Sequence, residues 1–124
     1  MKILVVDDSQ VMRKLVIRSI RQAGFGDATI CEASDGQEAI EVNHAELPDL
    51  ILADWNMPNM TGIEMLKQLR TCGDQVRVGF VTSESTAQIR LGAKEAGASF
   101  FISKPVESDK LAIALRSVAT RGKS

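Results

Sequence analysis

The stretch Leu50-Ile51-Leu52-Ala53-Asp54-Trp55-Asn56-Met57-Pro58 decides how this chain is interpreted. Its first four residues are apolar and predict a buried strand, which has to stop before Pro58 because proline cannot continue a sheet. An aspartate at the tip of such a strand is rigidly held and half sheltered, which suits a nucleophile or a metal ligand. Asp54 could also do no more than open a turn. This stretch alone leaves both interpretations open.

Length and charge predict one soluble globular domain. The chain has 124 residues, which is enough for a single core, so we expect one domain over residues 1–124 and no second domain. A net charge of −1 provides no general attraction to nucleic acid or to an anionic membrane. No apolar run approaches the roughly 18 residues of a spanning helix, and residues 3–6 are too few for a signal peptide. We therefore expect a cytoplasmic protein without membrane insertion.

The cysteines and the only histidine offer no metal or disulfide pattern. Cys31 and Cys72 lie far apart and lack the CxxC spacing, so we expect two reduced, largely buried thiols. His44 has no second histidine or cysteine at ligand spacing, and we interpret it as a surface residue.

Strand patterns and helix patterns alternate five times along the chain. The expected strands cover residues 3–6, 28–33, 50–53, 76–81 and 99–103. Helical spacing of apolar residues follows each of them, and Thr61 and Glu64 match a capping box at the start of the third helix. Because parallel strands need crossover connections, this order predicts an α/β fold with a doubly wound, five-stranded parallel sheet and helices on both faces.

Basic residues cluster on the first predicted helix, which follows Asp8 and Ser9 as alternative caps. Its charged side chains lie mostly off the apolar stripe: Arg13, Lys14, Arg18 and Arg21. We interpret them as a solvated face rather than a docking surface.

Polar residues stand at the carboxyl ends of four predicted strands, the edge at which ligands bind in such sheets. They are Asp7 and Asp8, Asp54, Thr82, and Lys104. Three gathered carboxylates repel one another unless a cation neutralises them, and Mg²⁺ is the natural partner for oxygen ligands. A carboxylate beside that ion can attack a phosphoryl group to give an acyl phosphate. A lysine and a hydroxyl can then hold the phosphoryl oxygens.

The complete pattern resembles the receiver domain of two-component response regulators, and the resemblance covers essentially the whole chain. It is carried by Val5-Val6-Asp7-Asp8-Ser9, by residues 54–62, by Thr82 and by Lys104-Pro105. The run from Asp54 to Pro58, in a chain with no output domain, is similar to the stand-alone, chemotaxis-type members of that family. The resemblance implies a flavodoxin-like, CheY-like fold.

The resemblance also implies a role for each site residue. Asp54 would be the phosphoacceptor and would receive its phosphoryl group from a phosphohistidine on a histidine kinase. Asp8, Asp54 and the backbone carbonyl of Asn56 would bind Mg²⁺ directly, and Asp7 would bind it through water. Thr82 and Lys104 would hold the phosphoryl group, and the Lys104–Pro105 peptide bond would be cis. The protein would take part in its own phosphorylation and dephosphorylation without being a turnover enzyme.

Signal output would follow from two switch residues. Phosphorylation would pull Thr82 inward and let Phe101 rotate, changing the face formed by helix four, strand five and helix five, where a downstream protein binds. Phe101 stands where tyrosine is frequent, so the switch would work by packing alone; Phe101 could instead be simply core. Asn56 and Glu84 occupy the two positions that in the resembled family tune hydrolysis of the acyl phosphate; both match the chemotaxis type, and the resemblance therefore implies a short-lived signal. A monomer is expected.

A stand-alone receiver in a non-chemotaxis phosphorelay would use the same residues. Functions outside this family fit the pattern less well. A phosphatase of the haloacid dehalogenase type wants its nucleophile on strand one with a second acid two residues later, whereas here Asp7 and Asp8 are adjacent and Ser9 follows. A flavin-binding protein would suffer repulsion between its phosphate and these acids. A receiver-like module without phosphorylation would not need the complete set of acids, hydroxyl and lysine.

Overall fold

Five strands and five helices alternate along the chain in the computed structural model, which describes residues 1–83 and 86–122, with side chains up to residue 119. The strands are β1 (Lys2–Val6), β2 (Thr29–Ala33), β3 (Leu50–Ala53), β4 (Arg77–Thr82) and β5 (Phe100–Ser103). The helices are α1 (Gln10–Gln22), α2 (Gly36–Glu46), α3 (Gly62–Thr71), α4 (Ala87–Glu95) and α5 (Ser108–Gly122). All of the predicted elements are present, with ends shifted by a residue or two.

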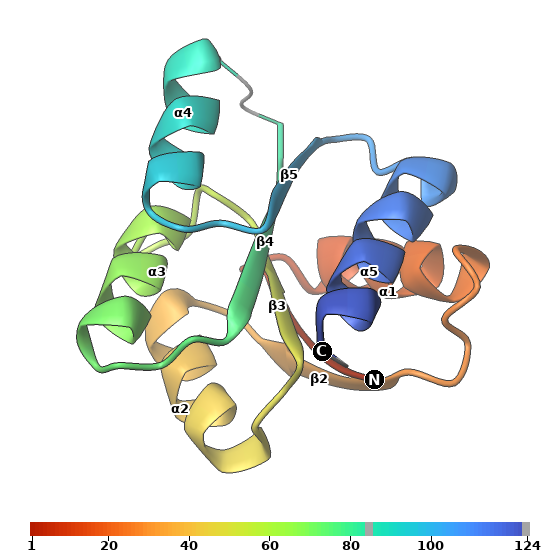
Figure 1. Cartoon of the computed structure of the whole chain (residues 1–124), viewed down its shortest axis with the longest axis horizontal. Helices are drawn as coiled ribbons and strands as arrows, with labels where there is room; N and C mark the ends of the chain where they lie inside the picture. The colour runs from red at the N-terminus through yellow and green to blue at the C-terminus, as the bar shows by residue number, and fades with distance from the viewer. Residues whose placement is uncertain (84–85, 123–124) are drawn as a thin grey trace.

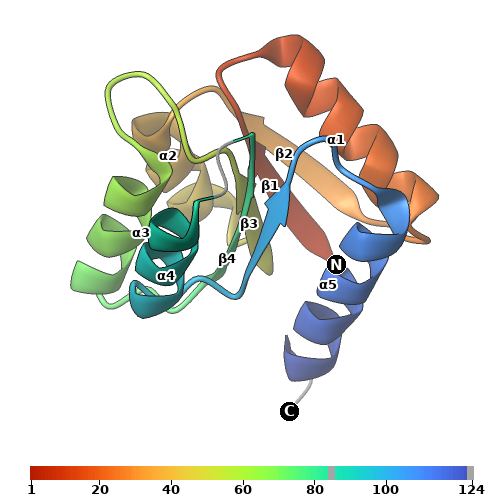
Figure 2. The same ribbon diagram turned by 90° about the horizontal axis from the view of Figure 1, so that it is seen from above.

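The strands form one parallel sheet in the order β2-β1-β3-β4-β5. Helices α1 and α5 cover one face, and α2, α3 and α4 cover the other (Figures 1 and 2). The predicted doubly wound α/β fold is therefore confirmed. The direction of winding reverses between β1 and β3, the position where such sheets place their ligands.

The core explains why the central strands are continuous apolar runs. Along β1, Leu4 and Val6 pack with α2 and α3, whereas Ile3 and Val5 pack with α1 and α5. Every residue of β3 is buried. A parallel sheet that is covered on both faces has no solvated side, so neither strand alternates apolar with polar residues.

Polar side chains begin the helices that flank the carboxyl ends of the strands. The Ser9 hydroxyl accepts a hydrogen bond from the Met12 amide at 3.2 Å, so Ser9 rather than Asp8 caps α1 and the Asp8 carboxylate is left for another role. Thr61 and Glu64 form the predicted capping box of α3.

Two sequence expectations about burial were wrong in part. Both cysteines are free, but Cys72 is exposed because it caps the end of α3, beyond the last buried turn at Leu69; Cys31 is partly buried. On α1, apolar spacing groups Val11 with the core residues, but Val11 is 67% exposed because two and a half turns separate it from the buried Ile20 and place it on the opposite side of the helix. His44 is exposed, as predicted. Within the described part of the chain, none of the helices has the length and apolarity needed to cross a bilayer.

Gly62 should be essential for the close packing of α3 on β3. A Cβ at this position would lie 2.6 Å from Cε1 of the buried Phe80 ring and 2.7 Å from the carbonyl oxygen of Asp54. Gly62→Ala should therefore lower the free energy of unfolding by about 1–3 kcal/mol, as overpacking does in other cores. Urea denaturation measures the change.

The matched control is Gly26→Ala, since a Cβ on Gly26 meets no heavy atom within 4 Å. This variant should be neutral or slightly stabilising, because alanine restricts the unfolded chain. Equal stability of Gly62→Ala and wild type would show that α3 does not approach Asp54 as closely as described.

Candidate functional site

Backbone hydrogen bonds just past the strand ends bring the predicted site residues together. The Asp54 amide donates to the Val6 carbonyl at 3.0 Å, which places Asp54 beside Asp7. On the other side of β3, the Lys104 amide donates to the Thr82 carbonyl at 2.8 Å. The strand register itself therefore gathers side chains from β1, β3, β4 and β5 at one edge, as the sequence predicted.

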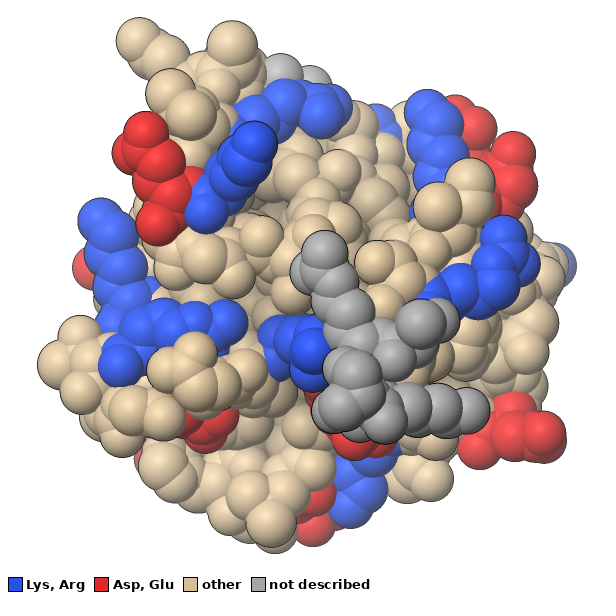
Figure 3. Space-filling model, viewed as in Figure 1, with Lys and Arg blue, Asp and Glu red and all other residues tan. Residues whose placement is uncertain are grey.

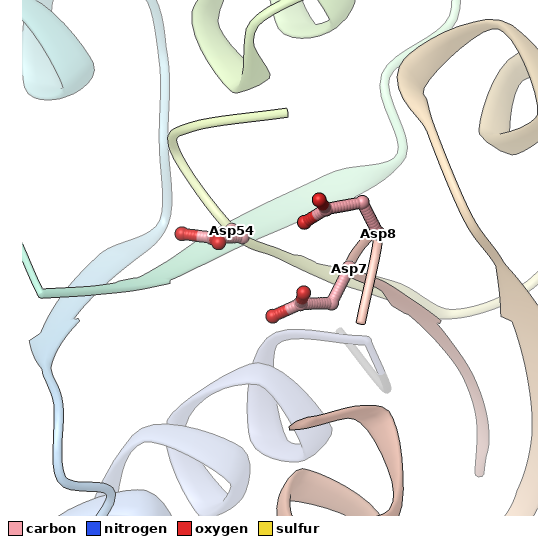
Figure 4. A group of neighbouring side chains, drawn as sticks. All are labelled: Asp7, Asp8 and Asp54. Atoms are coloured by element: carbon pink, nitrogen blue, oxygen red, sulfur yellow. The ribbon is translucent and has the colours of Figure 1, made fainter. Parts of the chain in front are cut away.

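Asp7, Asp8 and Asp54 form an acid cluster whose carboxylates turn toward one shared space (Figure 4). One oxygen of each lies within 4.8 Å of the others. Asp7 is buried, Asp54 is half-buried and Asp8 is exposed, so the cluster opens to solvent on the Asp8 side. Three carboxylate oxygens at this separation, with room for water, are the donor set that a hard divalent cation such as Mg²⁺ prefers. The residues present fit that ion.

Lys104 is the cation that faces this cluster. Its Nζ lies 3.3 Å from Oδ2 of Asp7 and 3.4 Å from Oδ2 of Asp54. The Lys104 side chain is 15% exposed, against 5% for Asp7 and 13% for Asp54, so solvent screens these pairs only partly. Asp7 is held further by the Ser9 amide, which donates to Oδ1 at 2.9 Å. Lys104 therefore contacts two of the three carboxylates, but its single positive charge offsets only one of their negative charges.

At Asp54, the Lys104 ammonium does not fully offset the cost of burying the negative charge. Burial raises the pKa of its carboxyl above the ordinary value of 3.8. The Lys104 ammonium lowers this pKa, the Asp7 carboxylate raises it, and a hydrogen bond from the Asn56 backbone lowers it. Because burial is the largest cause and the net direction is upward, the ionised Asp54 carboxylate is less stable here than in water. Such a carboxylate gains from a cation or from conversion to an ester-like group.

Thr82 ends β4, and Phe101 lies on the neighbouring strand β5. Thr82 is fully buried, and Phe101 is half-buried. The Phe101 ring makes an edge contact with Trp55 at 6.2 Å between ring centroids, and the Arg90 guanidinium lies over it at 5.1 Å from the ring centre. Trp55 is therefore a packed ring, joined to Phe101 and, at 5.2 Å, to Phe80.

The remaining predicted site features fall as follows. The Lys104–Pro105 peptide bond is cis, as expected. Asn56 is exposed just past the end of β3. Glu84 lies outside the described residues, so its predicted part in acyl phosphate hydrolysis stays a prediction.

Two arginines near the site were missed by the sequence reasoning. Arg13 was grouped with a solvated basic face, yet its guanidinium donates to the Asp7 carbonyl and pairs with Glu32. Arg90 covers Phe101 and donates to the Ser103 hydroxyl at 2.9 Å. Neither contact can be recognised from the sequence, because the partners of each arginine lie on other helices or strands. For Arg13, only its closeness in sequence to Asp7 and Asp8 could have drawn attention.

Comparison with known proteins gives one family. The family model for the response regulator receiver domain matches residues 3–116. Among curated relatives, response regulator MprA of Mycobacterium ulcerans (strain Agy99) is 33% identical over 122 residues, covering 98% of this chain and 51% of the relative. The chain thus spans about half the length of the curated relatives it matches.

Solved structures agree with this result. Chemotaxis protein CheY4 of Vibrio cholerae superimposes with a TM-score of 0.82 at 31% identity, covering 94% of this chain and 97% of that one. The receiver domain of Francisella response regulator 1452 gives a TM-score of 0.83 at 26% identity, covering 97% of each chain.

The raised pKa of Asp54 predicts how stability depends on pH without divalent cations. The folded-state pKa exceeds the unfolded value, so ionised Asp54 costs stability above the folded-state pKa, and this cost disappears as the pH falls through it toward 3.8. In EDTA at pH 7, Asp54→Asn should therefore raise Tm, and the difference from wild type should shrink as the pH approaches about 4. Thermal unfolding followed by circular dichroism measures both.

Asp27→Asn is the matched control, because Asp27 is exposed and its substitution removes the same charge. It should leave Tm nearly unchanged at pH 7. A lower Tm for Asp54→Asn than for wild type at pH 7 would mean that the Lys104 pair outweighs burial and the Asp7 charge.

Proposed function

The chain belongs to the response regulator receiver domain family of two-component signalling, and on that premise we propose that Asp54 is its phosphoacceptor. The observation that carries the proposal is the placement of Lys104 within 3.4 Å of Oδ2 of Asp54, beside two further carboxylates. A lone ionised carboxylate in this half-buried position is destabilised, as its raised pKa indicates. Conversion to an acyl phosphate moves the charge outward onto oxygens that Lys104 can reach.

The chemistry at Asp54 needs positioning more than proton transfer. A carboxylate oxygen attacks the phosphorus atom of a phosphohistidine, the phosphorus–nitrogen bond breaks, and the imidazole leaves. Lys104 sits between Asp7 and Asp54 before this step, and its flexible side chain lets the ammonium follow the transferred phosphoryl oxygens. Thr82, at the end of β4, supplies a hydroxyl at the same edge.

We assign the metal site to the acid cluster with one further ligand. Asp8, Asp54 and the Asn56 carbonyl would bind Mg²⁺ directly, and the buried Asp7 would bind it through water. When bound, the ion neutralises charge on the phosphoryl oxygens and holds them near Asp54. The exposure of Asp8 and Asn56 supports this assignment, because it leaves a solvent-facing side for water and substrate oxygens.

Output from the site would pass through Thr82 and Phe101. Movement of Thr82 toward the phosphoryl group would vacate space behind it, into which Phe101 can turn. The Phe101 ring also lines a groove of about 460 Å³ between α4, β5 and α5. In Figure 3, basic side chains lie on both sides of this mostly tan depression. A downstream protein would read the change on this face by packing, since Phe101 offers no phenol.

For partners, we propose a histidine kinase as phosphodonor and a chemotaxis-type role as a monomer in the cytoplasm. The run Asp54-Trp55-Asn56-Met57-Pro58 and the likeness to chemotaxis protein CheY4 support the chemotaxis role. The curated relatives are response regulators about twice as long, which favours the alternative of another phosphorelay. In both roles the protein carries a signal and is not a turnover enzyme.

Incubation with acetyl phosphate and Mg²⁺ tests the phosphoacceptor. Intact-mass spectrometry should detect the addition of one phosphoryl group, which EDTA should prevent. Asp54→Asn should abolish the addition because an amide is a poor nucleophile, whereas Asp27→Asn should be labelled like wild type. Equal labelling of Asp54→Asn would identify a different nucleophile.

The same labelled sample separates the alternatives. Once acetyl phosphate is removed, the added mass should disappear within minutes if the signal is of the short-lived chemotaxis type; persistence for hours would favour another phosphorelay. Continuous release of p-nitrophenol from p-nitrophenyl phosphate would instead indicate a phosphatase.

A further inference from the structure

Arg13, near the start of α1, ties together three segments that surround the acid cluster. Its guanidinium donates from one terminal nitrogen to the Asp7 carbonyl at 2.7 Å. Its Nε donates to Oε1 of Glu32, on β2, at 2.9 Å. The Arg13 side chain is 15% exposed and its bond to the Asp7 carbonyl is partly buried, whereas Glu32 is 45% exposed and its pair with Arg13 faces water. A fork that bonds a carbonyl and a carboxylate together holds a fixed geometry.

The Asp7 carbonyl belongs to the peptide unit that joins the two adjacent metal-binding acids. This unit is planar, so a hydrogen bond to its oxygen fixes the plane that runs from the Cα of Asp7 to the Cα of Asp8. The other side of Asp7 is already fixed, because its amide donates to the Ala33 carbonyl at 3.2 Å. Asp8 is exposed, so the direction of its carboxylate depends on the backbone that carries it.

We propose that Arg13 is a positioning residue for the divalent cation: by holding the Asp7–Asp8 peptide plane, it aligns the two carboxylates before the ion binds. Glu32 fixes the guanidinium and offsets its charge. The inference rests on the proposed function, since it concerns the same acid cluster. Groups that orient metal ligands without touching the metal commonly change metal affinity about ten- to hundredfold when they are removed.

If Arg13 acted only through its charge, its removal would change the Mg²⁺ affinity in the opposite direction. A guanidinium close to the acid cluster repels a divalent cation, so its removal should tighten Mg²⁺ binding if Arg13 acts only as a charge. If Arg13 positions the carboxylates, its removal should weaken Mg²⁺ binding even though a positive charge is lost. The sign of the change therefore separates the two roles.

A Mg²⁺ titration followed by Trp55 fluorescence measures this sign, because Trp55 adjoins Asp54 in the chain. Arg13→Met should raise the dissociation constant about tenfold or more. Arg13→Lys keeps the charge but cannot bond the Asp7 carbonyl and Glu32 in the same fixed fork, so its dissociation constant should lie between those of wild type and Arg13→Met. Arg18→Met, an exposed position on the same helix, should stay near the wild-type value.

Unchanged or tighter binding by Arg13→Met overturns the proposal. If Arg13→Met does not fold, Arg13→Lys decides alone, since weaker binding at constant charge supports positioning and wild-type binding contradicts it. An absence of any Mg²⁺ response in folded wild type is a different failure, because it overturns the proposed metal-dependent function itself.

Discussion

Asp7, Asp8 and Asp54 carry like charges into one half-buried space, and the parallel register of β1 and β3 leaves them little freedom to separate. The hydrogen bond from the Asp54 amide to the Val6 carbonyl continues the strand pairing to the edge of the site, so the backbones of Asp7 and Asp54 cannot move apart without breaking the sheet. Their repulsion is thus built into the fold. The pKa of Asp54 is raised first by burial, and the Asp7 carboxylate adds to this effect against the opposing Lys104 ammonium.

Each neighbour of the cluster can be understood as a response to that repulsion. Lys104 spans Asp7 and Asp54 from β5, and Ser9 donates to Asp7 from the start of α1. Arg13 holds the backbone between Asp7 and Asp8. These contacts lower the electrostatic cost without removing it, and under the proposed function the uncompensated part would favour binding of a cation and phosphorylation of Asp54. A fully neutralised cluster would be more stable and less reactive.

The sequence was sufficient where a residue's position followed from strand ends. Asp54, Thr82 and Lys104 each terminate an apolar strand, so a parallel sheet necessarily brings them to one edge. It was insufficient where a long side chain reaches another element. Arg13 pairs with Glu32, which lies 19 positions away in the sequence. Arg90 lies on α4 and contacts Phe101 and Ser103 of β5. Grouping the apolar residues by spacing also overstated the buried face of α1 at Val11, because two and a half turns place Val11 on the side of the helix opposite the buried Ile20.

Thermal unfolding in MgCl₂, compared with NaCl of equal ionic strength, tests most directly whether the carboxylates at the strand ends together bind a divalent cation that stabilises the fold. At ten times the dissociation constant, Mg²⁺ should add about 1.4 kcal/mol to the stability of wild type. Asp8→Asn should lose most of this gain while staying folded, because Asp8 is exposed and does not cap α1. Identical wild-type unfolding in the two salts, or an equal Mg²⁺ gain in Asp8→Asn, would contradict the account.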